Sequence, residues 1–200
     1  GMENFAIFYL CGSIVFRFFA NGTKSGLLSI VANGNLIKAK HLPREIFPIS
    51  RVIVALINSL FDLIVLFIFM VIFGVSFQIL CLFIPLLLLL ETIFILGVSF
   101  ILATQYVKWR DLNVIWTIVV SMLFWLVPAV YPISNVPSNY QLIYKLNPLT
   151  LLIINLRDVI LYERIPSFIN LLYLTLSSLF LLGFGIFLFN RGKKTFAEKI

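Results

Sequence analysis

Long apolar runs separated by short polar stretches dominate the pattern of this chain. The runs have membrane length, and they predict spans over residues 4–28, 52–75, 79–105, 112–130 and 168–190. A helix needs about 20 apolar residues to cross about 30 Å of hydrocarbon. Apolar and polar positions do not alternate, which favours helices over the strands of a membrane barrel. The short links between runs leave room for one transmembrane domain over residues 1–200.

The segment 33–51 joins the first two runs and is richer in polar residues than either. Basic and apolar side chains interleave at its centre, and the residues concerned are Leu36, Ile37, Lys38 and His41. This pattern predicts a short helix at the headgroup level. Pro43 favours a new helix start with Arg44 and Glu45 in its first turn, and Pro48 is expected to bend the chain into the next span. The segment is either a basic anchor on anionic lipid or a docking elbow for a cytoplasmic partner.

A second polar link, "VKWRD", separates the third and fourth runs. Arg110 and Asp111 are placed to cap the helices that they separate, with Asp111 favourable at a helix N-terminus. Lys108 adds a second basic side chain to this short link.

A proline-rich segment with two short predicted helices, over residues 138–165, follows the fourth run. Ser138 is suited to cap the first helix. Asn147 and Pro148 begin the second, with proline at the first helical position. That second helix is too short and too polar to cross a bilayer. It either re-enters the membrane from one side or lies on the surface.

The second short helix is predicted to have one polar stripe, made by Asn155, Asp158 and Tyr162. Ile153, Leu156 and Ile160 form its apolar face. The stripe suggests that the helix borders water on one side.

Composition supports an integral membrane protein. Hydrophobic residues make up 62% of the chain and charged residues only 12%, against about 25% in soluble domains. The net charge of +7 is distributed unevenly, with eleven Lys and Arg near the links after the first, third and fifth runs and three near the other links. Basic residues mark cytoplasmic loops, so the C-terminus is predicted to be cytoplasmic, and a nucleic-acid partner is not expected.

Arg17, Asp62 and Glu91 are charged residues within the predicted spans, and Asn58 lies one turn from Asp62. Such residues usually face the bundle interior and pair. Arg17 and Asp62 lie at similar distances from the link between their spans, with Asn58 beside Asp62 and Glu91 as a competing acid. The set is interpreted either as an ion pair that joins two helices or as the lining of a translocation path.

The chain has no motif for ordinary enzyme chemistry or nucleotide binding. Cys11 and Cys81 both lie in apolar runs, so no disulfide framework is predicted. His41 has no companions at metal-ligand spacing. We therefore expect no catalytic residue, no metal and no cofactor bound by this chain.

Four segments in order carry a resemblance to a known family: Asn35–Ser50, Val107–Leu112, Tyr131–Thr150 and Leu156–Ser167. They resemble the permeases of type-2 ABC exporters for bacterial surface polysaccharides, a group that covers O-antigen, capsule and teichoic-acid export. The resemblance covers essentially the whole chain. It implies an all-α polytopic fold with a cytoplasmic coupling helix and re-entrant external gate helices. The family's N-terminal amphipathic helix and first span have no counterpart in these 200 residues, where five spans are predicted.

The resemblance also implies roles for individual residues. The ATPase-coupling residues would be Leu36, Ile37, Lys38, His41, Pro43, Arg44, Glu45, Lys108, Arg110 and Asp111. The external gate would include Tyr131, Pro132, Asn147, Pro148, Asn155, Arg157, Asp158 and Tyr162.

The resemblance implies transport of a lipid-linked glycan across the bacterial plasma membrane. Expected partners are two ATP-binding ABC subunits that hold ATP and magnesium, a second permease copy and membrane lipids. One alternative is a drug, lipid or ion exporter of the same architecture. Others are a membrane enzyme acting on polyprenyl-linked sugars and a non-transporting assembly subunit.

Overall fold

The computed structural model describes residues 4–39, 42–193 and 196, and no strand occurs among them. In chain order the helices are α1 (Phe5–Ala32), α2 (Gly34–Ala39), α3 (Ile46–Ile72), the 3-10 helix η1 (Ile79–Phe83), α4 (Ile84–Lys108), α5 (Leu112–Leu126), the 3-10 helix η2 (Ile133–Asn135), α6 (Ser138–Lys145), α7 (Pro148–Ile160) and α8 (Phe168–Gly192). The chain has the all-α fold expected from its apolar runs.

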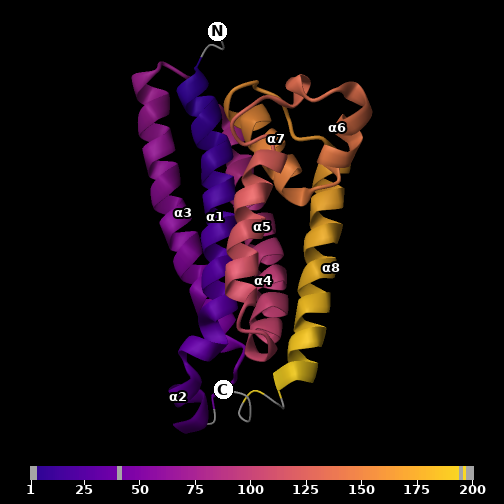
Figure 1. Cartoon of the computed structure of the whole chain (residues 1–200). Helices are drawn as coiled ribbons and strands as arrows, with labels where there is room; N and C mark the ends of the chain where they lie inside the picture. The colour runs from indigo at the N-terminus through magenta and orange to yellow at the C-terminus, as the bar shows by residue number, and fades with distance from the viewer. Residues whose placement is uncertain (1–3, 40–41, 194–195, 197–200) are drawn as a thin grey trace.

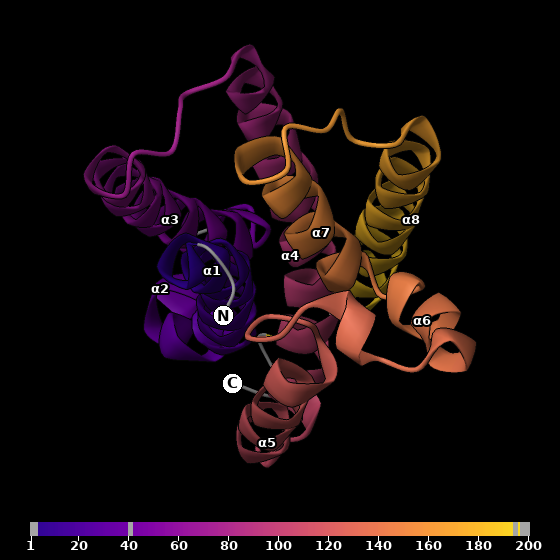
Figure 2. The same ribbon diagram turned by 90° about the horizontal axis from the view of Figure 1, so that it is seen from above.

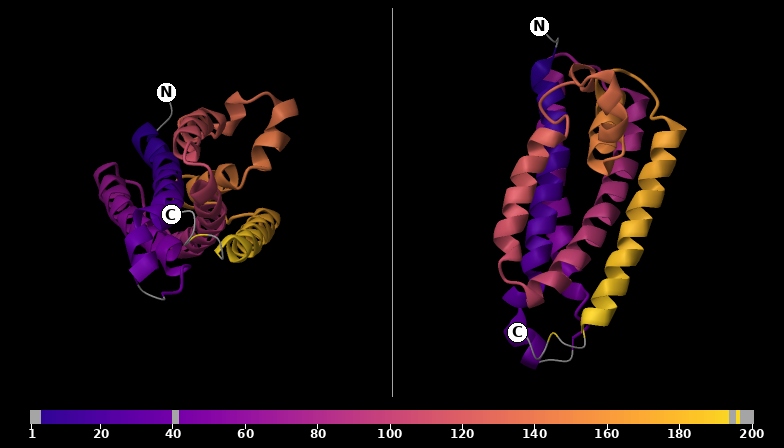
Figure 3. Two further views of the ribbon diagram at one scale, coloured as in Figure 1. Left: turned by 60° about the horizontal axis from the view of Figure 1, so that its bottom comes forward. Right: turned by 45° about the vertical axis from the view of Figure 1, so that its right-hand side comes forward.

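The long helices form an elongated bundle around α4 (Figures 1 and 2). Helices α1 and α3 pack on one side of α4 and α8 packs on the other, while α5 runs alongside α1 and α4. We call the end that carries α2 and the α4–α5 link the elbow end. The opposite end carries α6 and α7 and is called the gate end (Figure 3).

Within the described ranges, four helical segments have the length and apolar composition needed to cross a membrane: Phe5–Ala32, Ile46–Ile72, Ile79–Lys108 and Phe168–Gly192. Helix α5 is apolar but has only 15 residues, which is about 22 Å of helix. It ends at Leu126 because Val127 precedes Pro128 and is extended, with φ −94° and ψ 147°. The run predicted to continue to Val130 is therefore helical only to Leu126.

Helix α3 begins earlier than its apolar run. It starts at Ile46 and contains Pro48 in its first turn, where a helix needs no backbone N–H donor. The bend predicted at Pro48 is wrong for this reason, because the proline lies inside a continuous helix. The extra turn brings the start of α3 close to the end of α8 at the elbow end.

Close packing between α4 and α8 depends on two glycines that face each other. A Cβ at Gly185 would overlap the backbone oxygen of Gly97 and approach the Cβ of Phe100 to 3.2 Å. Small residues allow membrane helices to approach closely, and van der Waals contact then drives their association. The two glycines therefore set the separation of α4 and α8.

We predict that Gly185→Ala destabilises the bundle by about 1–3 kcal/mol, because the added methyl forces α8 away from α4. Gly183 lies on the same helix and has open space around it, so Gly183→Ala should be neutral or stabilise by up to about 1 kcal/mol. Unfolding in mixed micelles measures both changes. Equal effects of the two substitutions would contradict this account of the interface.

Candidate functional site

Helix α7 begins at the Asn-Pro pair, as the sequence predicts. The Asn147 side chain accepts a hydrogen bond of 3.0 Å from the backbone N–H of Leu149, and Pro148 occupies the first turn. The helix ends at Ile160, and the chain then turns through Glu163, whose φ is +53°. The first of the two short helices, α6, starts at Ser138 itself with Pro137 in the capping position, so the cap predicted at Ser138 is wrong.

Helix α7 is inserted among the long helices rather than laid over them. It contacts α1, α4 and α8, and most of its side chains are buried. Figures 2 and 3 show it crossing the gate end of α4, level with the outer turns of the long helices. A 13-residue helix in this position has the geometry of a re-entrant element.

Arg157 anchors α7 from inside the bundle. Its side chain is buried, and its guanidinium donates to the backbone oxygens of Phe8, at 3.1 and 3.2 Å, Pro128, at 2.6 Å, and Ala129, at 2.6 Å. Burial lowers the pKa of Arg157 to about 10, so the group remains charged at neutral pH. A single side chain thus links α7 to the start of α1 and to the turn after α5.

Two residues of α1 make room for this guanidinium. The Phe8 ring lies 3.5 Å from it in a cation–π contact, which partly replaces the lost hydration. A Cβ at Gly12 would overlap the oxygen of Ala129 and lie 2.7 Å from Arg157 Nη2. These contacts could not be predicted from the residue pattern, because any residue can supply a backbone carbonyl acceptor.

We predict that Arg157→Met lowers the free energy of unfolding by about 3 kcal/mol, because buried carbonyl oxygens lose a charged donor. Arg157→Lys should recover little of this loss, since an ammonium group cannot reproduce the planar fork. Arg164→Met is the matched control and should change stability by less than about 0.5 kcal/mol, because Arg164 is exposed. A loss at Arg157 no larger than the loss at Arg164 would contradict the anchoring role.

The predicted polar stripe of α7 is divided between two environments. Asn155 is buried and donates a hydrogen bond of 2.8 Å to the backbone oxygen of Leu151. Asp158 is half-buried, and Tyr162 is exposed. Asn155 therefore faces protein rather than the aqueous side predicted for the stripe.

An external pocket of about 400 Å³ lies at the gate end beside α7. Its charged lining consists of Lys145, Arg157, Arg164 and Asp158, with Pro132 and Tyr162 among its neutral residues. Burial raises the pKa of Asp158, and the charge of Arg164 partly opposes that shift. The pocket is polar, open and more cationic than anionic.

Tyr131 supports the turn before this pocket. Its hydroxyl donates a hydrogen bond of 2.9 Å to the backbone oxygen of Trp125. Desolvation and the neighbouring Tyr144 raise the pKa of Tyr131 to about 12, so the phenol is neutral. Tyr131 therefore has a positioning role in this conformation.

The elbow contains the short helix predicted from its pattern, α2. Leu36 is exposed and Ile37 is buried, so α2 has one face on the bundle and one face free. Pro43 is exposed and starts the turn that leads into α3. The side chain of Lys38 and the residue His41 lie outside the described part of the structure.

Arg44 and Glu45 contact the end of α8, a link that the sequence did not predict. Glu45 accepts a salt bridge of 2.9 Å from Lys193, and the Arg44 guanidinium lies 6.0 Å from the Phe196 ring. The hydrogen bond from Lys193 lowers the pKa of Glu45 below its ordinary value of 4.5. These contacts connect the elbow to the last helix.

We predict a pH dependence for this link. A carboxyl whose folded pKa is lowered stabilises the protein fully above its unfolded pKa, and the contribution is lost as pH falls through the folded value. The thermal midpoint of Glu45→Gln should therefore lie below that of the parent chain above pH 4.5, the ordinary value for Glu45. The two midpoints should converge at lower pH. A difference that is independent of pH would contradict the assigned salt bridge.

The α4–α5 link lies at the same end as α2 (Figure 1). Lys108, Arg110 and Asp111 are exposed there, and Trp109 is 68% exposed. Asp111 precedes α5, but its side chain makes no capping hydrogen bond. Those predicted coupling residues that the structure describes thus share one end of the molecule.

The expected contact between Arg17 and Asp62 is present, with 3.3 Å between Nη2 and Oδ1. However, the Arg17 side chain is 61% exposed, and Asn58 is also exposed. The pair therefore lies on the outer surface of the single chain, whereas a position in the bundle interior was predicted from the sequence. This polar surface, made by Arg17, Asn58 and Asp62, is called the α1–α3 polar face below.

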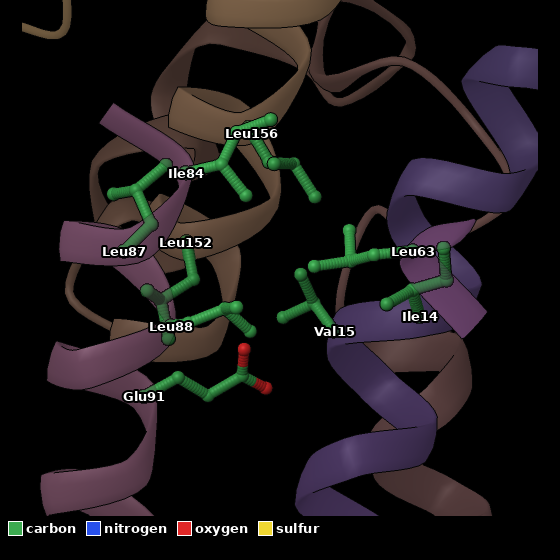
Figure 4. A pocket seen from close by; sticks show the side chains of 9 residues that line it. All are labelled: Ile14, Val15, Leu63, Ile84, Leu87, Leu88, Glu91, Leu152 and Leu156. Atoms are coloured by element: carbon green, nitrogen blue, oxygen red, sulfur yellow. The ribbon is translucent and has the colours of Figure 1, made fainter. Parts of the chain in front are cut away.

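Glu91 has a different environment from the other membrane-depth polar residues. It is only 2% exposed and points into a cavity of about 10 Å³ between α1, α3, α4 and α7 (Figure 4). The other lining residues are all apolar: Ile14, Val15, Leu63, Ile84, Leu87, Leu88, Leu152 and Leu156. Its Oε1 atom has no hydrogen-bond partner, so the predicted competition with Asp62 for Arg17 does not occur in this conformation.

The described residues thus form an apolar helical bundle with a short elbow helix at one end and inserted short helices at the other. The family model described as ABC-2 type transporter matches residues 2–161. The chain therefore belongs to the ABC-2 type transporter family.

Curated relatives include two proteins of Klebsiella pneumoniae called "O-antigen export system permease protein RfbA". Each is 28% identical over 199 residues, which cover 98% of this chain and 76% of the relative. A protein of Myxococcus xanthus with the same name is 26% identical over 201 residues, covering all of this chain and 77% of the relative. The similarity thus extends from α1 to the end of α8.

Proposed function

We propose that this chain is the membrane subunit of an ATP-driven exporter that moves a lipid-linked polysaccharide of the O-antigen type to the outer face of the plasma membrane. The names of its curated relatives support this substrate class. Two ATP-binding subunits would supply ATP hydrolysis, and a second permease copy would complete the path. The elbow end and the C-terminus would face the cytoplasm, in agreement with the bias of basic residues toward that end.

The observation that carries the proposal is that the two ends of the bundle expose different kinds of residues. The elbow end presents exposed apolar side chains beside charged ones, with Leu36 at 47% and Trp109 at 68% exposure. Exposed apolar groups among charges are typical of a protein docking surface. A push on α2 would reach α1 and α3 directly, because α2 lies between these two helices in the chain.

The α1–α3 polar face suits the wall of a path between two copies. An ion pair facing hydrocarbon is costly, so such groups normally face protein or a water-filled cavity. A second copy across this face would enclose Arg17, Asn58 and Asp62 in a polar space that a hydrated glycan can pass.

The gate end suits the exit. The external pocket offers Lys145, Arg164 and Tyr162 as hydrogen-bond donors, together with the Asp158 carboxyl. Sugars are bound through such polar groups and through contact with aromatic rings. Helix α7, which Arg157 anchors at one end, would form the inner side of the gate, with α6 and its connections as the exposed side.

Reconstitution of the chain with its ATP-binding partner in vesicles tests the proposal. ATP should drive a lipid-linked glycan to the opposite leaflet. The Leu36→Glu, Trp109→Ala variant should lose partner co-purification and transport by on the order of tenfold or more, because burial of those two side chains contributes several kcal/mol. Lys145→Glu, at the gate end, should leave co-purification unchanged. Undiminished partner binding in the double variant would overturn the docking assignment, and transport of dyes but not glycans would overturn the substrate class.

A further inference from the structure

The Glu91 cavity holds the most unusual polar group in the described structure. A carboxyl group lies at the meeting point of α1, α3, α4 and α7, within a core cluster of apolar side chains. Figure 4 shows the carboxyl pointing across the cavity toward Val15. Neither the docking surface nor the polar face gives this carboxyl a role.

No charge in the described residues offsets an ionised Glu91. The residues that face it from α1, α3, α4 and α7 are all apolar. Arg17 and Asp62 pair with each other on the outer surface, and the guanidinium of Arg157 is occupied by backbone oxygens. An isolated carboxylate in such a place is strongly unfavourable, so the group neutralises instead.

A bound water molecule would not stabilise an ionised Glu91 carboxylate. The cavity of about 10 Å³ is at the lower limit for one water, and a buried water needs two to four polar partners. Glu91 is the only polar residue in the lining. The cavity therefore has room for a protonated carboxyl but no means of solvating a carboxylate.

We propose that Glu91 is a proton-binding site whose occupancy keeps α7 packed against α1 and α4. With the proton bound, the apolar side chains Leu152 and Leu156 of α7 close the cavity over a neutral acid. Loss of the proton to water leaves a carboxylate, which must be hydrated. Hydration requires α7 to separate locally from the cavity, so the proton couples Glu91 to the gate helix.

Arg157 gives this movement a pivot. Its hydrogen bonds fix one end of α7 to the start of α1 and the turn after α5. Leu152 lies more than one turn before Arg157 and lines the cavity, so that half of α7 can retreat while the anchored end stays in place. The gate role of α7 rests on the exporter proposed above. In that exporter, the protonated acid would favour the closed gate.

Cysteine accessibility tests the proposal without a transport assay. Val15 lines the cavity opposite Glu91, so Val15→Cys is introduced into a full-length chain in which Cys11 and Cys81 are replaced by alanine. The chain is placed in vesicles of phosphatidylethanolamine and phosphatidylglycerol. The labelling rate with a water-soluble thiol reagent is then measured between about pH 6 and about pH 9, a range in which a buried carboxyl can titrate.

The control is the same chain with Glu91→Gln. Thiol ionisation speeds labelling equally in both chains, so their rate ratio isolates the effect of Glu91. We expect this ratio to rise by on the order of tenfold toward high pH, and Glu91→Asp to retain the rise, since its carboxyl still titrates. A ratio that does not change with pH overturns the proposal.

A second reporter separates local opening from general loosening. Ala103 is fully buried near the elbow end of α4, and Ala103→Cys should remain protected at every pH. Equal pH-dependent exposure of both reporters overturns the proposal, because the effect would then not be local to the cavity. A negative result in the labelling experiment leaves the export assignment intact, because the labelling experiment does not measure transport.

Discussion

The hydrogen bonds of Arg157 to backbone oxygens are the interaction on which the gate end depends. A buried guanidinium needs hydrogen-bond acceptors, and here three backbone carbonyl groups accept its hydrogen bonds while the Phe8 ring makes a cation–π contact. The acceptors come from α1 and from the turn after α5. The same contact therefore fixes a short helix, a long helix and a loop that are distant in sequence.

This anchor explains why α7 is both polar in sequence and buried in structure. Its apolar residues pack against α1 and α4, while Arg157 and Asn155 make their hydrogen bonds to backbone oxygens. Asp158 and Tyr162 remain for the external pocket. The helix thus separates an apolar interior, which contains Glu91, from a polar vestibule that faces the outside of the bundle.

Much of the fold followed from local pattern, because long apolar runs, prolines and an Asn-Pro pair act on nearby residues. The start of α7, the helix in the elbow and the Arg17–Asp62 contact were all predicted in this way. The end of α5 was misplaced because Val127 is apolar yet precedes a proline. The partners of Arg157 and Glu45 were not predictable, since carbonyl acceptors and the end of α8 are brought close only by the complete bundle.

The most direct test of the anchor is a magnetic-resonance distance measurement in membranes. A chain with 15N in the arginine side chains and 13C in the phenylalanine carbonyls should show a dipolar coupling between a guanidinium and a carbonyl, because Arg157 donates to the Phe8 oxygen at 3.1 and 3.2 Å. The coupling should disappear in Arg157→Met. Absence of the coupling in the parent chain, or its persistence in the variant, would contradict the central role assigned to Arg157.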